Sequence, residues 1–487
     1  MTDIVSPLAP RTKTQLIGLL LGASLFLLMQ LSSPPAGMSA DAWLVASLGV
    51  LMVTWWVTEA IPIAATALAP MAVLPFGGVA GLREIAAPYM SPIVILLMAG
   101  FIIAKAIEKW NLHERIALNV VSLVGSRPPA LIGGFMIASA LLSMWISNTA
   151  TSLIMTPIAL SVASAIAGES MEKAGPFRIA LVLAVAYACS IGGLTTPVGS
   201  PTNLIVIGYL ADQGVDVSFA EWMRVGAVVV FLVLPLAWAV LVMAGGKRFD
   251  VGEGGQDAKI VITERLKALG GLRAPEARTL AVFSVVALSW MFRSQIQKIP
   301  GFDYLNDQII AVVGAIAFFI LPSGARSAPS APLLDWSSAE RIPWGVVLLF
   351  GGGLSLASAM TSTGLAAYLA TYFDFLGAMP VFFVVLAIVV LVLSMTEVTS
   401  NVATASALLP LIGAIALATD YDLMTLAFPL GFAASCAFML PMATGPNAVA
   451  YASGAVSIGQ MARIGFRVNL IAAIVISVVI VFLAPAL

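Results

Sequence analysis

Charged residues are scarce in this chain of 487 residues. Its 23 Lys and Arg and 24 Asp and Glu side chains make up 10% of the sequence, against about a quarter of an average soluble domain. A water-soluble protein of this size could not cover its surface with so few charges. Hydrophobic residues make up 60% of the chain, and the mean hydropathy is +1.04. They come in runs of roughly 18 to 25 residues, the length of a membrane-spanning helix, which predicts an all-α polytopic protein of the lipid bilayer.

Histidine and cysteine are almost absent as well. One histidine, His113, and two cysteines, Cys189 and Cys436, leave no disulfide framework and no zinc cluster. The formal net charge of −1 argues against a nucleic-acid partner. An intramembrane enzyme would need a nucleophile with a base, paired acids or a metal site. The sequence has no transmembrane Asp pair, His-rich motif or Gly-x-Ser-x-Gly elbow, so we do not expect an enzyme.

Apolar runs bounded by charge, glycine or proline predict where the membrane helices lie. The runs are found near 14–32, 41–58, 61–79, 92–108, 225–245, 278–297, 307–322, 343–362 and 468–485. Two further regions, 128–209 and 380–456, are apolar but broken by polar clusters and prolines. We expect each to hold one re-entrant hairpin and one spanning helix, giving about 11 transmembrane helices plus two hairpins. A cleaved signal peptide is the alternative for the first run, but its length and the Ser-Ser-Pro-Pro that follows favour a retained helix.

The distribution of positive charge orients these spans through the positive-inside rule. With a cytoplasmic N-terminus, 19 of the 23 Lys and Arg residues fall on the cytoplasmic side. The exceptions are Arg83, Arg224, Arg293 and Lys298. We therefore expect a protein of the bacterial inner (plasma) membrane with its N-terminus in the cytoplasm and its C-terminus outside. The hydrophilic stretch 246–277 is predicted to be a cytoplasmic linker with a short surface helix at Thr263–Leu269.

The two halves of the chain repeat each other. Residues 143–157 match residues 396–410, and both segments carry Ser-Asn followed by a proline, 253 positions apart. Residues 197–203 match residues 441–447, 244 positions apart, and both run from Pro to Asn. An odd number of spans between the copies makes this an inverted repeat with paired interruptions, which points to a transport site at mid-membrane. Freed carbonyls, Ser hydroxyls and Asn amide oxygens suit Na⁺, while helix N-termini suit an anion. We expect Gly199 and the pair Gly445–Pro446 to let the chain turn.

Four ordered motifs resemble the divalent anion:sodium symporter family. They are Trp55-Trp-Val-Thr-Glu-Ala-Ile-Pro-Ile-Ala64, Ser147-Asn148-Thr149, Ser400-Asn401-Val402 and Phe438-Met-Leu-Pro-Met-Ala-Thr-Gly-Pro-Asn447. The resemblance implies a homodimer in which each protomer has a scaffold domain and a mobile transport domain that works as an elevator. The expected parts are scaffold helices in 1–127 and 278–379, transport-domain halves in 128–245 and 380–487, and the linker 246–277 between them.

The same resemblance implies binding roles for the two motif pairs. One Na⁺ would be held by Ser143, Ser147, Asn148 and Gly199, and a second by Thr396, Thr399, Asn401 and Ala443. Substrate carboxylates would meet Ser147, Asn148, Thr149, Ser200, Pro201, Ser400, Asn401, Val402 and Thr444. Val402 departs from the family pattern because it replaces a Thr, so one hydroxyl is missing, and Gly445 stands where a Pro is common.

The function that follows is secondary active transport of C4-type dicarboxylates (succinate, malate, fumarate) by symport with two or more Na⁺ ions. Dicarboxylate exchange and transport of sulfate or citrate use the same scaffold and stay open as alternatives. A channel would also use broken helices, and saturating, counter-exchanging flux would exclude it. No Arg or Lys lies in either Ser-Asn motif. A dianion would therefore have to be neutralised by bound Na⁺ and oriented dipoles.

Five isolated residues need separate interpretations. Glu397 lies beside the second Ser-Asn motif and could carry protons, but we favour a carboxylate that accepts backbone N–H groups at the hairpin tip or pairs at the scaffold interface. Glu59 is expected to be an interfacial or helix-end acid that orders the turn Thr58–Pro62. His113 is expected to face solvent on an amphipathic surface helix over 110–127, and the two cysteines to be small helix-packing residues.

Overall fold

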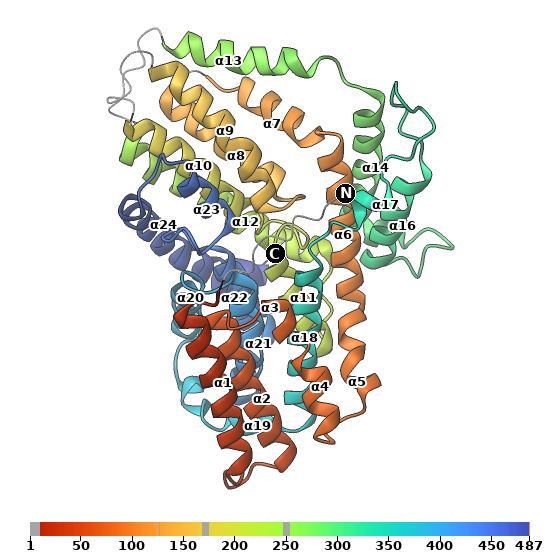
Figure 1. The fold of residues 1–487 in the computed structure, drawn as a ribbon, viewed down its shortest axis with the longest axis vertical. Helices are drawn as coiled ribbons and strands as arrows, with labels where there is room; N and C mark the ends of the chain where they lie inside the picture. The colour runs from red at the N-terminus through yellow and green to blue at the C-terminus, as the bar shows by residue number, and fades with distance from the viewer. Residues whose placement is uncertain (1–9, 126, 168–174, 247–253, 487) are drawn as a thin grey trace.

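The structure, a computed structural model, describes residues 10–125, 127–167, 175–246 and 254–486 (Figure 1). Within these ranges the regular structure is helical, and the only β-pairing is two isolated bridges in the loop 322–332. Nine helices of the described part are long and apolar enough to span a bilayer, and five more apolar helices are shorter. The chain is therefore an all-α polytopic membrane protein, as predicted. The count of about 11 spans stays a prediction.

Helices occupy all nine positions that the apolar runs predict. They are α1 (Lys13–Leu31), α2 (Ala40–Thr58), α3 (Ile63–Thr66) with α4 (Ala69–Phe76), α6 (Pro92–Lys109), α12 (Phe219–Leu241), α14 (Ala274–Met291), α16 (Asp307–Ile320), α18 (Trp344–Ser362) and α24 (Ile458–Val478). The two largest differences from the prediction concern the run 61–79 and helix α24. The run 61–79 is split into two short helices, and α24 begins ten residues before 468, because Ser457 and Gln460 form a capping box there.

Each interrupted region folds as a helical hairpin followed by a broken helix. The hairpins are α8 (Pro128–Ser143) with α9 (Asn148–Ala167), and α20 (Val381–Thr396) with α21 (Asn401–Ala418). The broken helices are α10 (Gly175–Gly192) with α11 (Pro201–Asp212), and α22 (Leu423–Ser435) with α23 (Gly445–Ala452). The unwound segments 193–200 and 436–444 contain Pro197 and Pro441, which cannot donate a backbone hydrogen bond. The same local chemistry thus interrupts both halves at matched positions.

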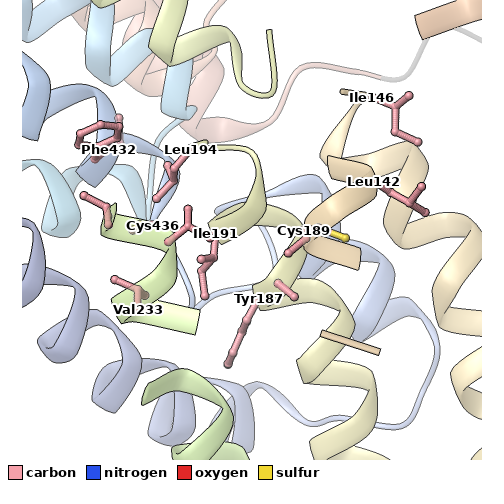
Figure 2. Close-up of a cluster of buried hydrophobic side chains, with 14 of the residues drawn as sticks. Leu142, Ile146, Tyr187, Cys189, Ile191, Leu194, Val233, Phe432 and Cys436 are labelled. Atoms are coloured by element: carbon pink, nitrogen blue, oxygen red, sulfur yellow. The ribbon is translucent and has the colours of Figure 1, made fainter. Parts of the chain in front are cut away.

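Helix α10 forms the centre of the apolar core. Fourteen of its 18 residues are buried, as expected for a helix that is hydrophobic on all sides. Figure 2 shows Tyr187, Cys189 and Ile191 of α10 among side chains of the first hairpin and of α22. Cys189 and Cys436 are buried free thiols, which confirms that they are packing residues.

The linker is more helical than predicted. Helix α13 (Gly254–Leu269) replaces the expected short helix and packs on α7 (Leu112–Ser122) and α9, along the top of Figure 1. Arg115 of α7 donates to the carbonyl oxygen of Gly270 just after α13 (2.9 Å) and pairs with Glu276 of α14 (2.7 Å). The linker residues 247–253, and the predicted cytoplasmic cations Lys173, Lys247 and Arg248, lie outside the described residues.

The prediction that His113 faces solvent is wrong. Its side chain is 3% exposed, and its Nδ1 lies 3.2 Å from the carbonyl oxygen of Ile107. Helix α7 packs against α8 on one side and α13 on another, so little of its surface stays open. Burial lowers the pKa of His113, although the Ile107 carbonyl opposes this shift.

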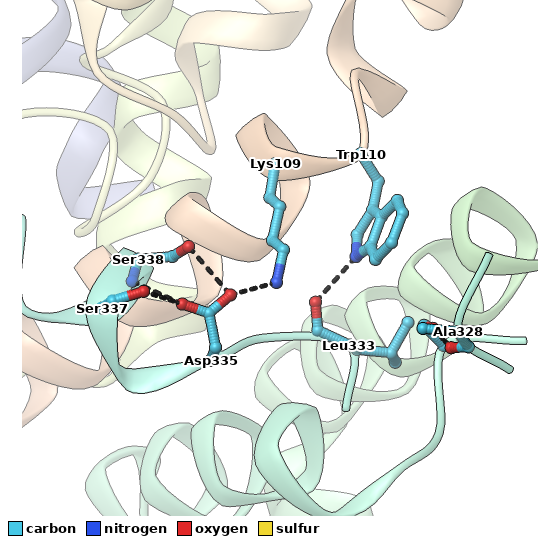
Figure 3. A network of polar contacts seen from close by, with 8 residues as sticks. Lys109, Trp110, Ala328, Leu333, Asp335, Ser337 and Ser338 are labelled. Atoms are coloured by element: carbon cyan, nitrogen blue, oxygen red, sulfur yellow. Dashed lines mark hydrogen bonds and ion pairs between the residues drawn. The ribbon is translucent and has the colours of Figure 1, made fainter. Parts of the chain in front are cut away.

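Polar contacts fix the end of α6 to the segment that leads into α17 (Trp336–Ala339) (Figure 3). The Lys109 ammonium pairs with Asp335, which also accepts from the Ser338 hydroxyl at 3.1 Å. The Trp110 indole N–H donates to the carbonyl oxygen of Leu333 at 2.7 Å. These contacts hold one wall of the cavity described next, to which α6 contributes.

Candidate substrate and ion site

One cavity of about 1040 Å³ joins the two Ser-Asn motifs and the two broken helices. It is formed by residues 145–150, 198–202, 398–402 and 442–446, together with residues of α1, α2, α6 and the start of α18. All nine residues predicted to bind substrate line it: Ser147, Asn148, Thr149, Ser200, Pro201, Ser400, Asn401, Val402 and Thr444. The fold thus brings together side chains that are up to about 300 positions apart in the chain.

Four helices begin at this cavity. The N-termini of α9, α11, α21 and α23 are the segments that line it. The first backbone N–H groups of a helix have no partner within the helix, and neither Ser200 nor Ser400 caps its helix with a side-chain hydrogen bond. Each N-terminus carries about +0.5 of an elementary charge. Four of them make a site for an anion without a cationic side chain in the motifs.

The first Ser-Asn motif lies in a cluster of oxygen atoms. The Asn148 side-chain oxygen is 3.2 Å from the carbonyl oxygens of both Gly199 and Cys189, and it accepts from the Ser143 hydroxyl. If the amide is turned over, its nitrogen donates to the same three oxygens. Oxygens that face one another need a cation between them or a donor in place of one of them. The turned-over amide satisfies these contacts by itself, so the oxygen cluster consists of the Ser143 hydroxyl and the carbonyls of Gly199 and Cys189 around the amide.

Two glycines make this oxygen cluster possible. A Cβ on Gly193 would lie 2.7 Å from the Asn148 side-chain oxygen, and one on Gly199 would lie 2.6 Å from the Gly193 carbonyl oxygen. Gly199 lies in a hydrogen-bonded turn, as expected, with its N–H 3.2 Å from the Thr196 carbonyl oxygen, and Gly445 begins α23 just after the turn 441–443, although neither has a positive φ. A Cβ on Gly445 would lie 1.9 Å from the Thr149 hydroxyl oxygen. Gly199 and Gly445 both permit close approach between segments of the chain.

The second motif has the equivalent cluster. The Thr396 hydroxyl oxygen lies 2.8 Å from both the Asn401 side-chain oxygen and the Ala434 carbonyl oxygen. The Thr396 hydroxyl has one proton, so it can donate to only one of these two oxygens at a time. The Thr399 hydroxyl contacts other groups: it donates to the Met395 carbonyl oxygen at 2.9 Å and lies 2.5 Å from the Thr404 hydroxyl. Thr396, like Ser143 in the first half, is fully buried behind its asparagine rather than exposed to the cavity.

Two asparagines that were not assigned to the site hold the unwound segments in shape. The Asn203 amide donates to the carbonyl oxygens of Gly193 and Thr196, both at 2.8 Å. The Asn447 amide donates to the carbonyl oxygens of Ala437 and Leu440, both at 3.0 Å. Each asparagine and each of its two carbonyl partners has its counterpart 244 positions away in the other half of the chain. The Asn side chain that ends each Pro-to-Asn motif therefore donates to backbone carbonyls that have no helical partner in the unwound segment.

Glu397 binds the second unwound segment. Its carboxylate accepts the backbone N–H groups of Phe438, Met439 and Leu440 at 2.8 to 3.1 Å. It also accepts the Asn469 amide at 2.7 Å. The favoured interpretation, a carboxylate that satisfies backbone N–H groups, is confirmed, but the groups belong to 436–444 rather than to the hairpin tip. The matched position in the first half is Met144, which cannot play this part.

Charged side chains line the cavity outside its two motifs. Lys105 and Arg341 line it, and Lys105 pairs with Glu108 at 2.6 Å. Glu59 also lines it and ends α2 with a left-handed backbone (φ 47°), as a helix-end acid was expected to do. The absence of cations thus holds for the two motifs but not for the whole cavity.

Comparison with known proteins places this geometry in a family. Residues 13–487 match the family model of the sodium:sulfate symporter transmembrane region. The sodium-dependent dicarboxylate transporter SdcS of Staphylococcus saprophyticus is 38% identical over 480 residues, covering 97% of this chain and 92% of that protein. SdcS of Staphylococcus aureus is also 38% identical, over 98% of this chain and 92% of that protein. The crystal structure of the YdaH transporter of Alcanivorax borkumensis has a similar fold, with a TM-score of 0.60 at 14% identity, over 91% of this chain and 99% of that one.

Proposed function

Because this chain belongs to the sodium:sulfate symporter family, whose members are transporters rather than enzymes, we propose that it couples the uptake of dicarboxylates to Na⁺. The observation that carries the proposal is the single cavity in which four helix N-termini meet two oxygen clusters. The N-termini attract a dianion, and the oxygen clusters attract the cations that neutralise it. The names of the SdcS relatives, which are sodium-dependent dicarboxylate transporters, support the same pair of substrates.

The substrate is a C4-type dicarboxylate such as succinate, malate or fumarate. Its carboxylates meet the two hairpin tips, where backbone N–H groups and hydroxyls converge from both halves. Thr444 adds a donor, because its oxygen accepts the Asn447 N–H at 3.2 Å and its proton is free to bind a carboxylate. Val402 offers a methyl surface where the matched Thr149 offers a hydroxyl. The second carboxylate therefore makes fewer hydrogen bonds than the first.

Two Na⁺ ions travel with the dianion. The first occupies the cluster of Ser143, Ser147, Asn148 and Gly199, to which the Cys189 carbonyl is added. The second occupies the cluster of Thr396, Thr399, Asn401 and Ala443, to which the Ala434 carbonyl is added. All these ligands are neutral oxygens, which suit a hard monovalent cation. Two Na⁺ balance two carboxylates, so the site has no uncompensated charge when it is full.

This conformation is inferred to open the cavity to the cytoplasm. Thr12, Lys105 and Arg341 line the cavity, and the positive-inside rule places all three at the cytoplasmic face. In an elevator, the transport-domain halves 128–245 and 380–487 carry the site across the membrane against the scaffold parts 1–127 and 278–379. Two such protomers form the functional homodimer.

Uptake of labelled succinate into proteoliposomes tests the proposal. An inward Na⁺ gradient alone is expected to drive accumulation, whereas an inward H⁺ gradient alone is not. Uptake that depends only on internal dicarboxylate would replace symport by exchange. Preference for sulfate or citrate in competition would replace the C4 assignment. Absence of any Na⁺ effect would refute the coupling.

A further inference from the structure

Three buried hydroxyls form a closed ring between the two halves of the chain. Ser200 and Thr202 of the first broken helix and Ser435 of the second have hydroxyl oxygens 2.7 to 2.9 Å apart in all three pairs. Their side chains are 3%, 1% and 1% exposed. A hydroxyl has one proton and two lone pairs, so three of them satisfy one another when each donates once around the ring.

The ring links the two oxygen clusters through two peptide units and one hydrogen bond. Ser200 directly follows Gly199, whose carbonyl belongs to the first cluster. Ser435 directly follows Ala434, whose carbonyl belongs to the second cluster. One peptide unit therefore separates each cluster from the ring, and the hydrogen bond between Ser200 and Ser435 (2.8 Å) closes the path.

The ring occurs once, although the repeat offers two places for it. Shifted by 244 positions, Ser200 corresponds to Thr444, Thr202 to Pro446 and Ser435 to Ile191. Neither Pro446 nor Ile191 has a hydroxyl, so a second ring cannot form. The ring is thus a contact between the halves, where α11 packs against α22, rather than a product of the repeat itself.

We propose that this hydroxyl ring couples the two Na⁺ sites, so that an ion in one favours binding of an ion in the other. The inference rests on the proposed function and adds positioning residues to it. An ion that draws in the Gly199 carbonyl fixes the backbone at Ser200, and the ring passes this constraint to Ser435 and the Ala434 carbonyl. The first ion to bind thus orders the backbone at both sites. The second ion then binds without that entropy cost, so the binding of the two ions is positively cooperative. By linkage, the effect is the same in both directions.

The variant Ser435→Ala isolates this role, because it removes both bonds between the halves and leaves Ser200 and Thr202 bonded to each other. Thr202→Val removes a hydroxyl at nearly constant shape but keeps the direct bond from Ser200 to Ser435, and Thr202→Ser keeps all three hydroxyls. Ser477→Ala is the matched control: its hydroxyl is equally buried but bonds only within α24, to the Ala473 carbonyl oxygen at 2.8 Å.

The readout is the Na⁺ dependence of succinate uptake in proteoliposomes at saturating succinate. We expect a Hill coefficient for Na⁺ near 2 in the unmodified protein, in Thr202→Ser and in Ser477→Ala, because about two ions bind cooperatively. Ser435→Ala should lower it toward 1 and raise the half-saturating Na⁺ concentration about fivefold or more, the lower end of common coupling factors. Thr202→Val should fall between these limits.

Two results separate failure of the coupling from failure of the function. If Ser435→Ala transports with the same Hill coefficient and half-saturating Na⁺ as Ser477→Ala, the coupling is refuted while Na⁺ symport stands. If uptake by the unmodified protein ignores Na⁺, both fall. Should Ser435→Ala be inactive, Na⁺-dependent thermal stabilisation of the purified variant gives the same comparison. If the melting temperature of Ser435→Ala rises as steeply with Na⁺ concentration as that of Ser477→Ala, the coupling is refuted. A less steep rise in Ser435→Ala supports it.

Discussion

Glu397 offers the sharpest test of how the unwound segments serve the ion sites. One carboxylate oxygen accepts the N–H groups of Phe438 and Met439 and the Asn469 amide, and the other accepts Met439 and Leu440. Replacing Glu397 by Gln keeps one acceptor oxygen and turns the other into an N–H₂ group that faces backbone donors. The shape of the side chain changes little, so the effect reports hydrogen bonding and charge.

The magnitude follows from the bonds that are lost. A hydrogen bond to a charged group contributes about 1.5–3 kcal/mol, and at least the bond from Leu440 disappears. The remaining bonds weaken, because charge-assisted bonds are roughly twice as strong as neutral ones. We expect the segment 436–444 to lose about 3 kcal/mol of its preference for the present conformation. Since about 1.4 kcal/mol is a factor of ten, a loss of about 3 kcal/mol should raise the half-saturating Na⁺ concentration by roughly a hundredfold.

The assay is Na⁺ titration of succinate uptake, with two comparison variants. Met144→Leu changes the matched position of the first half, where no carboxylate is present, and should transport like the unmodified protein. Asn469→Ala removes one donor and leaves the three backbone N–H groups bound, so its effect should be smaller. A Glu397→Gln protein with unchanged half-saturating Na⁺ would refute the argument. If that protein instead lost only stimulation by a pH gradient, Glu397 would be a proton carrier.

Three further predictions concern single residues. Asn148→Ala should abolish uptake while the melting temperature stays within a few degrees, as the side chain is a ligand more than a packing element. Gly445→Ala should reduce uptake strongly because its Cβ would meet the Thr149 hydroxyl, whereas Gly459→Ala, with nothing within 4 Å, should not; equal activity would contradict the packing. Because burial lowers the pKa of His113, its contribution to stability is lost as pH falls below about 6.5. The melting temperature should then drop less in His113→Gln than in the unmodified protein, and equal drops would contradict this.

Much of the fold could be predicted because its signals are local in the sequence. Apolar runs of sufficient length predict helices wherever they occur, and Pro197 and Pro441 mark the two breaks. The repeat added long-range information: two matched pairs of motifs predicted one shared site, and all nine proposed substrate ligands line one cavity. These residues carry their chemistry in their side chains, so a sequence pattern can reveal them.

What the sequence could not predict depends on backbone groups and on long-range packing. The carbonyls of Cys189 and Ala434 join the oxygen clusters, yet any residue has a carbonyl, so no pattern marks them. Gly445 was expected to let the chain turn, but its close approach to Thr149, which is almost 300 positions away, could not be expected. The burial of His113 depends on packing by α8 and α13, and helical periodicity cannot reveal a covering helix.

In the proposed site, a dianion binds this cavity through helix N-termini and co-bound Na⁺, without a cation from the motifs. The most direct measurement is calorimetric binding of succinate to the purified protein, in NaCl and in choline chloride of equal ionic strength. We expect clear binding in Na⁺ and its collapse in choline, because the motifs themselves hold no cation to compensate two negative charges. Equal affinity in the two salts would contradict it.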